Sequence, residues 1–457
     1  MSSEPSTASV RPARPQKGDV VELRIESLAH GGAGVARTES GYVVFVGETV
    51  PGDRVRARVF KRKRQYAEAR LVELLEAGPD RIEPKADHPG APWQILPYER
   101  QLELKQQQVT EALRRLGGLE GYELEPIVPA VEQWRYRNKL EFSFGTQDGK
   151  LVCGFHKPGS WEEIVGLEDC LLQSERGNQV RRDVLAWARG QGLDAYDRRA
   201  QQGALRNVVI REGRRTGEVQ VRLVVSAGAE IDRRSLAEAI KVDSLLLTTK
   251  ADTGATTAGG ETELVAGAAK IAEELCGLRF RLSAEAFFQT NTEMAERLYG
   301  VAAEFADLQG WERLFDLYCG IGTIGLTMAA RAGEVWGLEI VEEAIEDARD
   351  NARANEVTNA RFFAGDVRTG LRDLVAEAGK PDVVVVDPPR AGLSSKVVRR
   401  IIEAAPRRIV YVSCNPTTLA PNAGQLVEAG YRLRRVRPVD MFPQTPHIEA
   451  VAVLDRA

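Results

Sequence analysis

The sequence predicts an α/β protein that ends in a doubly wound, mainly parallel sheet of seven strands. A small β-barrel and a middle β-rich α+β domain are expected before that sheet. The chain of 457 residues exceeds what one hydrophobic core usually serves. Short alternating stretches broken by glycine fill residues 17 to 75, and from about residue 285 strand, glycine turn and helix alternate.

The composition is that of a soluble globular protein, with 43% hydrophobic and 28% charged residues. A net charge of -4 is too small to indicate a polyanionic or membrane partner by itself. Residues 1–15 contain no apolar core of signal-peptide length, and no stretch approaches the roughly 18 apolar residues of a membrane span. We therefore expect a cytoplasmic protein without a membrane partner, monomeric by default, with a disordered lead over residues 1–15.

Five widely spaced cysteines, without a CxxC pair, argue against a disulfide framework and against a cysteine-rich metal site. No metal is therefore expected. Four of them are interpreted as small apolar side chains: Cys153, Cys170, Cys276 and Cys319. Cys414 is treated separately below.

Residues 16–76 alternate apolar and polar residues at period two, which predicts a small barrel. Between Arg54 and Arg64, seven of eleven residues are cationic and none is acidic, and Tyr66 follows. One interpretation is a solvated strand face. The other is a nucleic-acid surface, because clustered cations release counterions from a phosphate backbone and aromatic rings stack on bases. On the second interpretation, the predicted contacts include Arg62, Lys63 and Arg64.

Residues 90–280 are predicted to form the middle domain, led by a helix. Apolar residues recur at helical spacing from Tyr98 to Leu116, and Gly117 and Gly118 end the helix. The strands and loops that follow include a hairpin, LRNVVIREGRRTGEVQVRLVV, which turns at residues 213–217. No catalytic cluster is evident in this region.

Residues 281–457 carry the alternating units. Ligands of a doubly wound sheet bind beyond the carboxyl ends of its strands, and the candidate residues follow such ends. Gly320, Gly322 and Gly325 form a G-x-G-x-x-G turn after the strand LFDLYC, and Glu339 ends the next strand, 14 residues beyond the last glycine. A carboxylate there can accept both ribose hydroxyls. Dinucleotide oxidoreductases and S-adenosylmethionine (SAM) methyltransferases both use this pattern.

Three features favour SAM. The glycine turn lies two-thirds along the chain, and the sheet finishes the protein. Asp316 and Asp366, at two further strand ends, add carboxylates that suit an ammonium group and an adenine amine. The same carboxylates would repel a pyrophosphate. For Asp366, a simple turn residue is the alternative interpretation.

Asp387 to Arg390, with the sequence DPPR, end the fourth strand of this region. Two consecutive prolines fix the backbone and cannot extend a strand ladder, so they predict a rigid ledge that holds Asp387 beside cofactor and substrate. Amino-methyltransferases place an aromatic residue after such prolines to stack the base. Arg390 takes that place here, which makes nitrogen methylation less favoured.

Cys414 is predicted to be a nucleophile. Asn415 is a preferred N-cap and Pro416 a preferred first helical residue, so a helix should begin directly after the thiol. The positive end of a helix dipole favours a thiolate. Addition of a thiolate to carbon 6 of uracil makes carbon 5 nucleophilic toward a methyl donor, and a base must then remove the proton at carbon 5.

Glu449, which interrupts an apolar strand, suits that base because partial burial raises the pKa of a carboxyl group. His447 is expected to pack or to orient a neighbour, and its role stays open.

Five segments resemble successive motifs of the RNA (uracil-5-)-methyltransferases: FFQTN, DLYCGIGTIGL, VVVDPPRAGL, YVSCNPTTLA and DMFPQTPHIEAVAVL. The N-terminal barrel resembles the TRAM domain of that family. The resemblance spans nearly the whole chain beyond the first 15 residues. It implies a Rossmann-like SAM methyltransferase domain over residues 281–457, and RNA binding by the barrel and the middle domain.

The resemblance also implies residue roles. Cys414 would attack carbon 6 and Glu449 would be the base, while Phe287 would lie against a flipped uracil. SAM would be contacted by Gln289, Tyr318, Glu339 and Asp387, with Thr323 at a position where relatives often carry asparagine. The implied product is 5-methyluridine in structured RNA, with 23S rRNA preferred and the T-loop of tRNA as the alternative.

One departure concerns an iron–sulfur cluster that many relatives hold between barrel and helix. That stretch reads DHPGAPWQILPYERQ here and has no cysteine. Cys170 resembles the fourth ligand in position, but one thiolate cannot hold a four-iron cluster. We therefore predict no iron–sulfur cluster.

Two other readings stay open. Methylation of cytosine at carbon 5 uses the same thiol addition, but it requires a proton donor to the ring nitrogen and a different cysteine context. The other hypothesis is that the protein is an RNA-binding assembly factor, which binds SAM without turnover. The target uridine, and whether one or two are modified, cannot be deduced from one sequence.

Overall fold

The computed structural model describes residues 14–457, so most of the predicted disordered lead lies outside the described residues. The chain divides into two compact units. The first contains the residues up to Asp87 together with 91–105 and 443–446, and the second contains 88–90, 106–442 and 447–457. Among the described residues, no helix has the length and apolar character that crossing a membrane requires.

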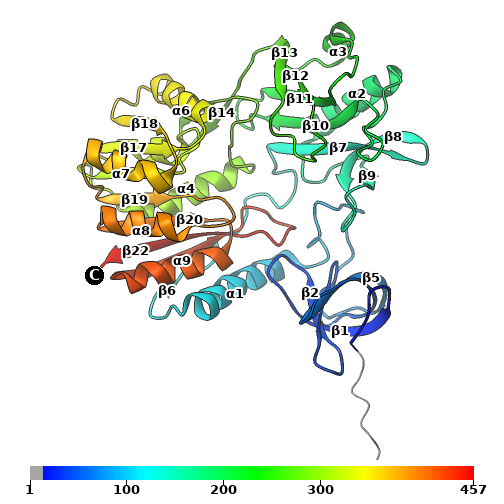
Figure 1. The fold of residues 1–457 in the computed structure, drawn as a ribbon, viewed down its shortest axis with the longest axis horizontal. Coiled ribbons are helices and arrows are strands. Elements are labelled where there is room, and N and C mark those ends of the chain that lie inside the picture. The colour runs from blue at the N-terminus through cyan, green and yellow to red at the C-terminus, as the bar shows by residue number, and fades with distance from the viewer. Residues whose placement is uncertain (1–13) are drawn as a thin grey trace, which may run out of the picture. The chain divides into compact units, whose positions relative to one another are not determined.

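The first unit contains the predicted barrel (Figure 1). It is closed in the order β1-β2-β3-β5-β4. The alternation of apolar and polar residues explains why these strands close into a barrel. In β4, Val55, Ala57 and Val59 point into the barrel and are buried, while the arginines between them are exposed. The strands are β1 (Val20–Leu28), β2 (Gly34–Arg37), β3 (Val43–Val46), β4 (Arg54–Arg62) and β5 (Tyr66–Glu76).

The middle region of the second unit is a seven-stranded sheet in the order β13-β12-β11-β10-β7-β8-β9. The predicted hairpin is confirmed, because β10 and β11 pair antiparallel. Helices α2 (Glu175–Gly190) and α3 (Arg233–Ala239) belong to this region. The strands are β7 (Lys139–Gln147), β8 (Lys150–His156), β9 (Ile164–Gly166), β10 (Leu205–Glu212), β11 (Val219–Ser226), β12 (Ser244–Lys250) and β13 (Glu261–Gly267).

A separate two-stranded hairpin follows, made by β14 (Ile271–Leu275) and β15 (Leu278–Leu282). Its turn consists of Cys276 and Gly277, which both have positive φ values, 52° and 78°. Cys276 is therefore exposed. This corrects the interpretation of Cys276 as a small buried side chain, whereas Cys153, Cys170 and Cys319 are buried as expected.

The predicted doubly wound sheet is confirmed, with the order β18-β17-β16-β19-β20-β22-β21-β6. Its seven predicted strands are joined by an eighth at the edge, the two-residue β6 (Glu123–Leu124), which pairs parallel to β21. Only β22 runs against its neighbours. The seven strands are β16 (Arg313–Leu317), β17 (Glu334–Glu339), β18 (Ala360–Ala364), β19 (Val383–Val386), β20 (Arg408–Ser413), β21 (Tyr431–Val439) and β22 (Glu449–Arg456).

Both faces of this sheet are covered by helices (Figure 1). In β19, Val383 and Val385 pack into one core and Val384 and Val386 into the other, which explains an uninterrupted run of valines. The first core includes α4 (Thr292–Ala306), α5 (Thr323–Met328) and α6 (Glu342–Ala354). The second includes α7 (Val367–Ala378), α8 (Ser395–Ala404), α9 (Pro416–Glu428) and the end of α1 (Tyr98–Gly117), the predicted leading helix.

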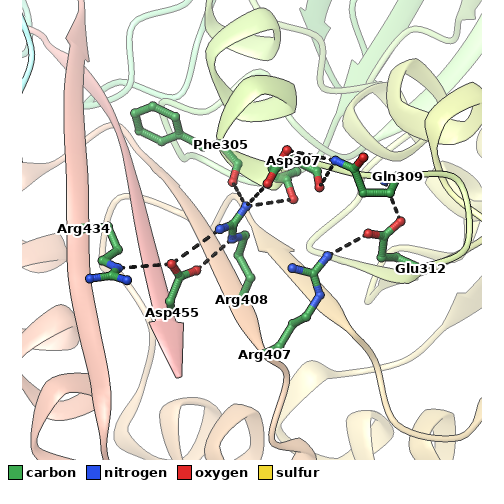
Figure 2. A network of polar contacts seen from close by, with 9 residues as sticks. Phe305, Asp307, Gln309, Glu312, Arg407, Arg408, Arg434 and Asp455 are labelled. Carbon is green, nitrogen blue, oxygen red and sulfur yellow. Dashed lines mark hydrogen bonds and ion pairs between the residues drawn. The ribbon is translucent and has the colours of Figure 1, made fainter. Parts of the chain in front are cut away.

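Two arginines at the amino-terminal start of β20 form ion pairs with neighbouring acids (Figure 2). They lie at the end of the sheet opposite the carboxyl ends of the parallel strands. Arg408 donates to the carboxylates of Asp455 at 2.8 Å and Asp307 at 3.2 Å. Arg407 donates to Glu312 at 2.7 Å. Asp307 ends α4 in a left-handed conformation, so this network ties α4 to β20 and β22.

Candidate active site

A cavity of about 660 Å³ opens at the carboxyl ends of β16, β17, β19 and β20. Doubly wound sheets bind ligands at this edge. The structure brings ten of the predicted site residues together in its wall: Phe287, Gln289, Tyr318, Gly320, Thr323, Glu339, Asp387, Arg390, Cys414 and Glu449.

The glycine turn after β16 forms one side of the cavity. Gly322 has a φ of 83°, and Thr323 directly after it begins α5. At Gly325 a side chain would come within 2.8 Å of Asp316 Oδ2, the atom that accepts a hydrogen bond from the Gly325 amide at the same distance. Glycine therefore lets the helix start lie directly on a buried carboxyl group.

Glu339, at the end of β17, is held by main-chain amides. Its Oε1 accepts from Ile340 at 2.8 Å and from Val341 at 3.1 Å, and its Oε2 accepts from Gly320 at 3.3 Å. These bonds leave further lone pairs on both oxygens, so the carboxylate can still accept from a hydroxyl pair in the cavity. This arrangement suits the ribose contact expected of Glu339.

Asp316 and Asp387 are two acidic groups of unusual proton affinity. Burial raises the pKa of Asp316 to about 7, although the hydrogen bond from Gly325 opposes that rise. Burial and the neighbouring Asp316 raise the pKa of Asp387 to about 7. Asp387 lines the cavity, whereas Asp316 is fully buried and supports the glycine turn instead. A cation that enters beside Asp387 would favour its ionised form.

Several predicted residues do not line the cavity. Gly322 shapes the turn without lining it. Asp366 caps α7, where it accepts from the Arg368 amide at 2.8 Å and pairs with the Arg368 guanidinium, which lowers the pKa of this carboxyl group. The barrel residues Arg62, Lys63 and Arg64 belong to the other compact unit.

Cys414 and Glu449 stand opposite each other at the end of one strand pair. Ser413 of β20 faces Ala450 of β22 in the antiparallel register, so the next pair outward is Cys414 and Glu449. As predicted, α9 begins directly after the thiol, because the side chain of Asn415 accepts from the Thr417 amide at 3.0 Å and Pro416 is the first helical residue. Both functional groups face the same cavity.

The electrostatics of Cys414 differ from the prediction that a helix start favours a thiolate. Burial, and then the carboxyl groups of Glu449 and Asp387, raise the pKa of Cys414 to about 11, against the opposing charge of Arg390. The thiol form therefore dominates while the cavity holds no cation. The helix start is present, but burial and two acidic neighbours outweigh it.

Glu449 is 3% exposed, and its Oε2 has no hydrogen-bond partner within residues 14–457. Burial and Asp387 raise its pKa well above the usual range of a carboxyl group, and Arg390 opposes the rise. A carboxylate in such a place binds a proton strongly, which is the property expected of a base that accepts a proton from carbon.

The sequence reasoning missed part of the wall. Arg137, from the region where no catalytic cluster was expected, lines the cavity with its guanidinium 5.3 Å from the Phe442 ring centre. Tyr299 shares a hydrogen bond of 3.1 Å with Thr323. Arg390 donates to His447 Nδ1 at 3.2 Å, in line with the orienting role expected of His447. For Arg137, the sequence WRYRNK holds no signal that separates it from neighbouring cations.

The residues of the cavity fit SAM. Glu339 offers an acceptor for the ribose, Asp387 offers an acidic group for a cationic ligand, and Thr290 Oγ1 and Glu449 Oε2 are buried in the wall without a hydrogen-bond partner among the described residues. Buried polar atoms of this kind call for a ligand or water. The volume also suits a ligand of this size.

A metal ion requires a group of donor side chains. Within residues 14–457, no group of three or more histidine, cysteine or acidic side chains could hold an ion. The buried thiol of Cys170 lies 3.2 Å from His88 Nε2. One thiol does not fit a four-iron cluster, which needs four. The absence of an iron–sulfur cluster stays a prediction.

In the fold, neighbouring acids reduce the net positive charge of the basic barrel segment between Arg54 and Arg64. Cross-strand acids pair with three of the seven cations of this segment: Arg54 with Glu22, Arg56 with Glu73, and Lys61 with Glu68. Such exposed pairs add little stability, but they reduce the local positive charge. The remaining cations cluster toward the end of β4 and the following turn, where Arg62, Lys63 and Arg64 are exposed.

A doubly wound sheet with a glycine turn and an acidic cavity at its carboxyl edge has the architecture of an SAM-dependent methyltransferase. Comparison with known proteins narrows this class. The family model described as tRNA (Uracil-5-)-methyltransferase matches residues 256–457, and that of the TRAM domain matches residues 14–72. The chain belongs to the RNA (uracil-5-)-methyltransferase family.

The similarity to known proteins extends over almost the whole chain. An RNA methyltransferase from Halalkalibacterium halodurans is 40% identical, covering 96% of this chain and 97% of the relative. One from Gloeobacter violaceus is 40% identical, covering 98% and 99%. The solved Pyrococcus abyssi tRNA (uracil-54, C5)-methyltransferase in complex with S-adenosyl-L-homocysteine (SAH) has a TM-score of 0.77 and 29% identity, over 95% of this chain and 100% of that one.

Proposed function

We propose that this methyltransferase forms 5-methyluridine in structured RNA through a covalent bond between Cys414 and carbon 6 of the target uracil. The observation that carries the proposal is the facing pair of Cys414 and Glu449 in one cavity wall. A thiol alone would serve many reactions. A thiol opposite a buried carboxyl group suits an addition that must later lose a proton.

The chemistry requires four events at the pyrimidine. Cys414 adds as a thiolate to carbon 6, which breaks the double bond between carbons 5 and 6 and places an electron pair on carbon 5. SAM, when bound, would supply an electrophilic methyl group to carbon 5, and the bond from its sulfur to that methyl group would break to leave SAH. Glu449 then removes the proton from carbon 5, the double bond re-forms, and Cys414 leaves. Gln289, Tyr318, Thr323, Glu339 and Asp387 are the proposed cofactor contacts.

The target base must leave its stack to enter this cavity. Phe287 lines the cavity and is 66% exposed, so it offers a ring against which an extruded uracil can lie. Arg390 and its hydrogen-bond partner His447 line the same cavity and are proposed to contact the nucleotide. In the other compact unit, we propose that Arg62, Lys63 and Arg64 contact the RNA backbone.

The preferred substrate is 23S rRNA, as the sequence reasoning proposed. Transfer RNA is the second candidate, and one observation favours it: the solved relative with a TM-score of 0.77 acts on uracil 54 of tRNA. Mass spectrometry of 5-methyluridine in total RNA, from cells with and without the gene, separates the two. Loss from 23S rRNA alone supports the first candidate, and loss from tRNA alone supports the second.

The covalent step is tested with RNA that contains 5-fluorouridine. Fluorine cannot be removed as a proton, so wild-type protein with SAM is expected to form an adduct stable to denaturing gels. Cys414→Ala should form none. Glu449→Gln should accumulate a methylated adduct on unmodified RNA. The proposal fails if wild-type protein methylates RNA yet gives no adduct, or if Cys414→Ala gives as much adduct as wild type.

A further inference from the structure

We propose that a second pocket, in the middle sheet, binds a single-stranded nucleotide of the RNA substrate, with the phosphate at Arg198 and the base on Trp161. The proposal rests on the proposed function only in taking RNA as the substrate. The pocket has a volume of about 410 Å³. None of its residues lines the cavity that contains Cys414.

The floor and the walls of this pocket come from separate parts of the middle region. Residues 143–146 of β7 and His156 at the end of β8 contribute to it. Further lining residues come from the loop between β8 and β9, which carries Trp161, and from residues 195–199. His156 Nε2 lies 3.2 Å from Ser143 Oγ, which joins the two strands inside the pocket.

The acids at the pocket are already engaged, and in the described part of the chain the arginine of the pocket that lacks an ion pair is Arg198. Glu162 pairs with Arg199. The carboxylate of Asp197 accepts from the main-chain amides of Arg199 at 2.7 Å and Ala200 at 3.0 Å. Burial and then Arg198 lower the pKa of His156, so the positive charge comes from the arginines.

Arg198 is the group that a ligand would satisfy. It is half-buried, and within residues 14–457 it has no hydrogen bond or ion pair. Its neighbour Arg206 is engaged, donating to the main-chain oxygen of Asp252 at 2.6 Å and lying 5.1 Å from the Tyr196 ring centre. Burial and the charge of Arg206 lower the pKa of Arg198. Arg206 also pairs with the Asp252 carboxylate at 3.6 Å, so the charge that a phosphate would compensate is that of Arg198.

Trp161 supplies the second half of the site. Its side chain is 54% exposed, which is unusual for the largest apolar residue, and the Arg199 guanidinium lies 5.4 Å from its ring centre. An exposed aromatic ring beside cations is the arrangement on which proteins stack unpaired bases. An acidic peptide could neutralise Arg198, but its carboxylates would make no use of the exposed ring of Trp161.

The pocket is tested in the full-length protein with Trp161→Ala and Arg198→Ala. Arg234→Ala serves as a matched control, since Arg234 is an exposed arginine of the same region on α3. The dissociation constant for a 23S rRNA fragment, measured at several salt concentrations, is expected to rise about tenfold in Trp161→Ala. In Arg198→Ala it should rise severalfold, and the salt slope should fall by about one. SAH affinity should not change.

Ultraviolet cross-linking to the same RNA should place nucleotides on the peptides that carry Trp161 and Arg198. RNA dissociation constants equal to wild type in both variants, or losses equal to those of Arg234→Ala, would overturn the proposal. Both readouts measure binding and are independent of turnover. Wild-type protein that binds RNA through this pocket without forming 5-methyluridine would contradict the proposed function alone.

Discussion

The side-chain amide of Asn138 donates a hydrogen bond of 2.9 Å to the main-chain oxygen of Gln289, although 151 positions separate the two residues. Asn138 precedes β7 of the middle sheet, and Gln289 lies in the wall of the cavity that contains Cys414. The same amide donates to Thr292 Oγ1 at 2.9 Å. The residue that leads into the middle sheet therefore holds the main chain of this cavity wall directly.

Replacing Asn138 by alanine should weaken SAH binding severalfold. It leaves the Gln289 oxygen without this donor, and loss of a buried hydrogen bond costs about 1–3 kcal/mol. Calorimetric titration with SAH measures the affinity, and thermal unfolding measures the stability. Asn178→Ala, which also removes a buried asparagine with main-chain partners, should lower stability without changing SAH affinity. Equal SAH affinities in wild type and Asn138→Ala would contradict the positioning role.

The raised pKa of Cys414 predicts slow alkylation in the free enzyme. With a pKa of about 11, the thiol form dominates at neutral pH, and the reaction with iodoacetamide should accelerate as pH rises toward that value. Glu449→Gln removes the largest charge effect on this thiol. It should therefore speed alkylation severalfold at moderately alkaline pH, since one pKa unit changes the thiolate fraction about tenfold.

Mass spectrometry of the Cys414 peptide distinguishes this thiol from the exposed Cys276, whose pKa is also raised to about 11. Glu304→Gln, in a half-exposed residue of α4, is the matched control and should react like wild type. If Glu449→Gln leaves the Cys414 alkylation rate unchanged, the carboxyl group of Glu449 does not suppress the thiolate.

Local patterns predicted the parts of the site that neighbours in sequence determine. The start of α9 follows from Asn415 and Pro416, and the turn before α5 follows from its glycines. The fold class follows from strand and helix periodicity in the same way. In each case the physical cause acts within a few residues, so that one sequence contains it.

What the sequence could not predict depends on strand register and on distant neighbours. The pKa of Cys414 is raised by burial, and then by Glu449 of β22 and by Asp387, directly after β19. Asp366 becomes a helix cap paired with Arg368, outside the cavity wall. The two-residue β6 is too short to leave a periodic pattern. Pairing of barrel cations with acids likewise requires the β1–β4–β5 register.

Asp316→Asn should change how stability depends on pH. The folded protein raises the pKa of Asp316 from 3.8 to about 7. The stabilisation that comes from the protonated side chain is therefore fully present below the unfolded-state pKa, and it is lost as pH rises through the folded-state pKa. The asparagine oxygen can still accept from Gly325. The free energy of unfolding of the variant, relative to that of wild type, should therefore increase from about pH 5 to about pH 8, by up to a few kcal/mol. Urea midpoints at both pH values measure it, and a constant difference would contradict burial as the cause.

Asp455→Asn should behave in the opposite way. Burial opposes ionisation of Asp455, but Arg408 and Arg434 outweigh it and lower the pKa (Figure 2). The ionised carboxylate therefore stabilises the fold above about pH 4, and this contribution is lost as pH falls. The variant should lose about 1–3 kcal/mol near neutral pH and less in acid. Urea midpoints check this, and SAH affinity should stay unchanged. Equal losses at both pH values would exclude the ion pairs as the cause.

Glu339 should contribute to cofactor affinity through its charge as well as its shape. Its two oxygens accept hydrogen bonds from the main-chain amides of Gly320, Ile340 and Val341, and these bonds fix the carboxylate at the cavity wall. Glu339→Ala removes a charged acceptor, and hydrogen bonds to charged groups contribute about 1.5–3 kcal/mol. The dissociation constant for SAH should therefore rise about tenfold or more.

Glu339→Gln sharpens this test because it keeps the shape of the side chain. Only one of its two terminal atoms can accept, so when the oxygen serves Ile340 and Val341, the amide nitrogen faces the Gly320 amide, and two donors oppose each other. Its SAH affinity should fall nearly as far as that of Glu339→Ala. Glu342→Ala, an exposed acid in the first turn of α6, is the matched control. Calorimetric titration that gives wild-type affinity for Glu339→Gln would show that an uncharged acceptor suffices, and wild-type affinity for both Glu339 variants would place the ribose elsewhere.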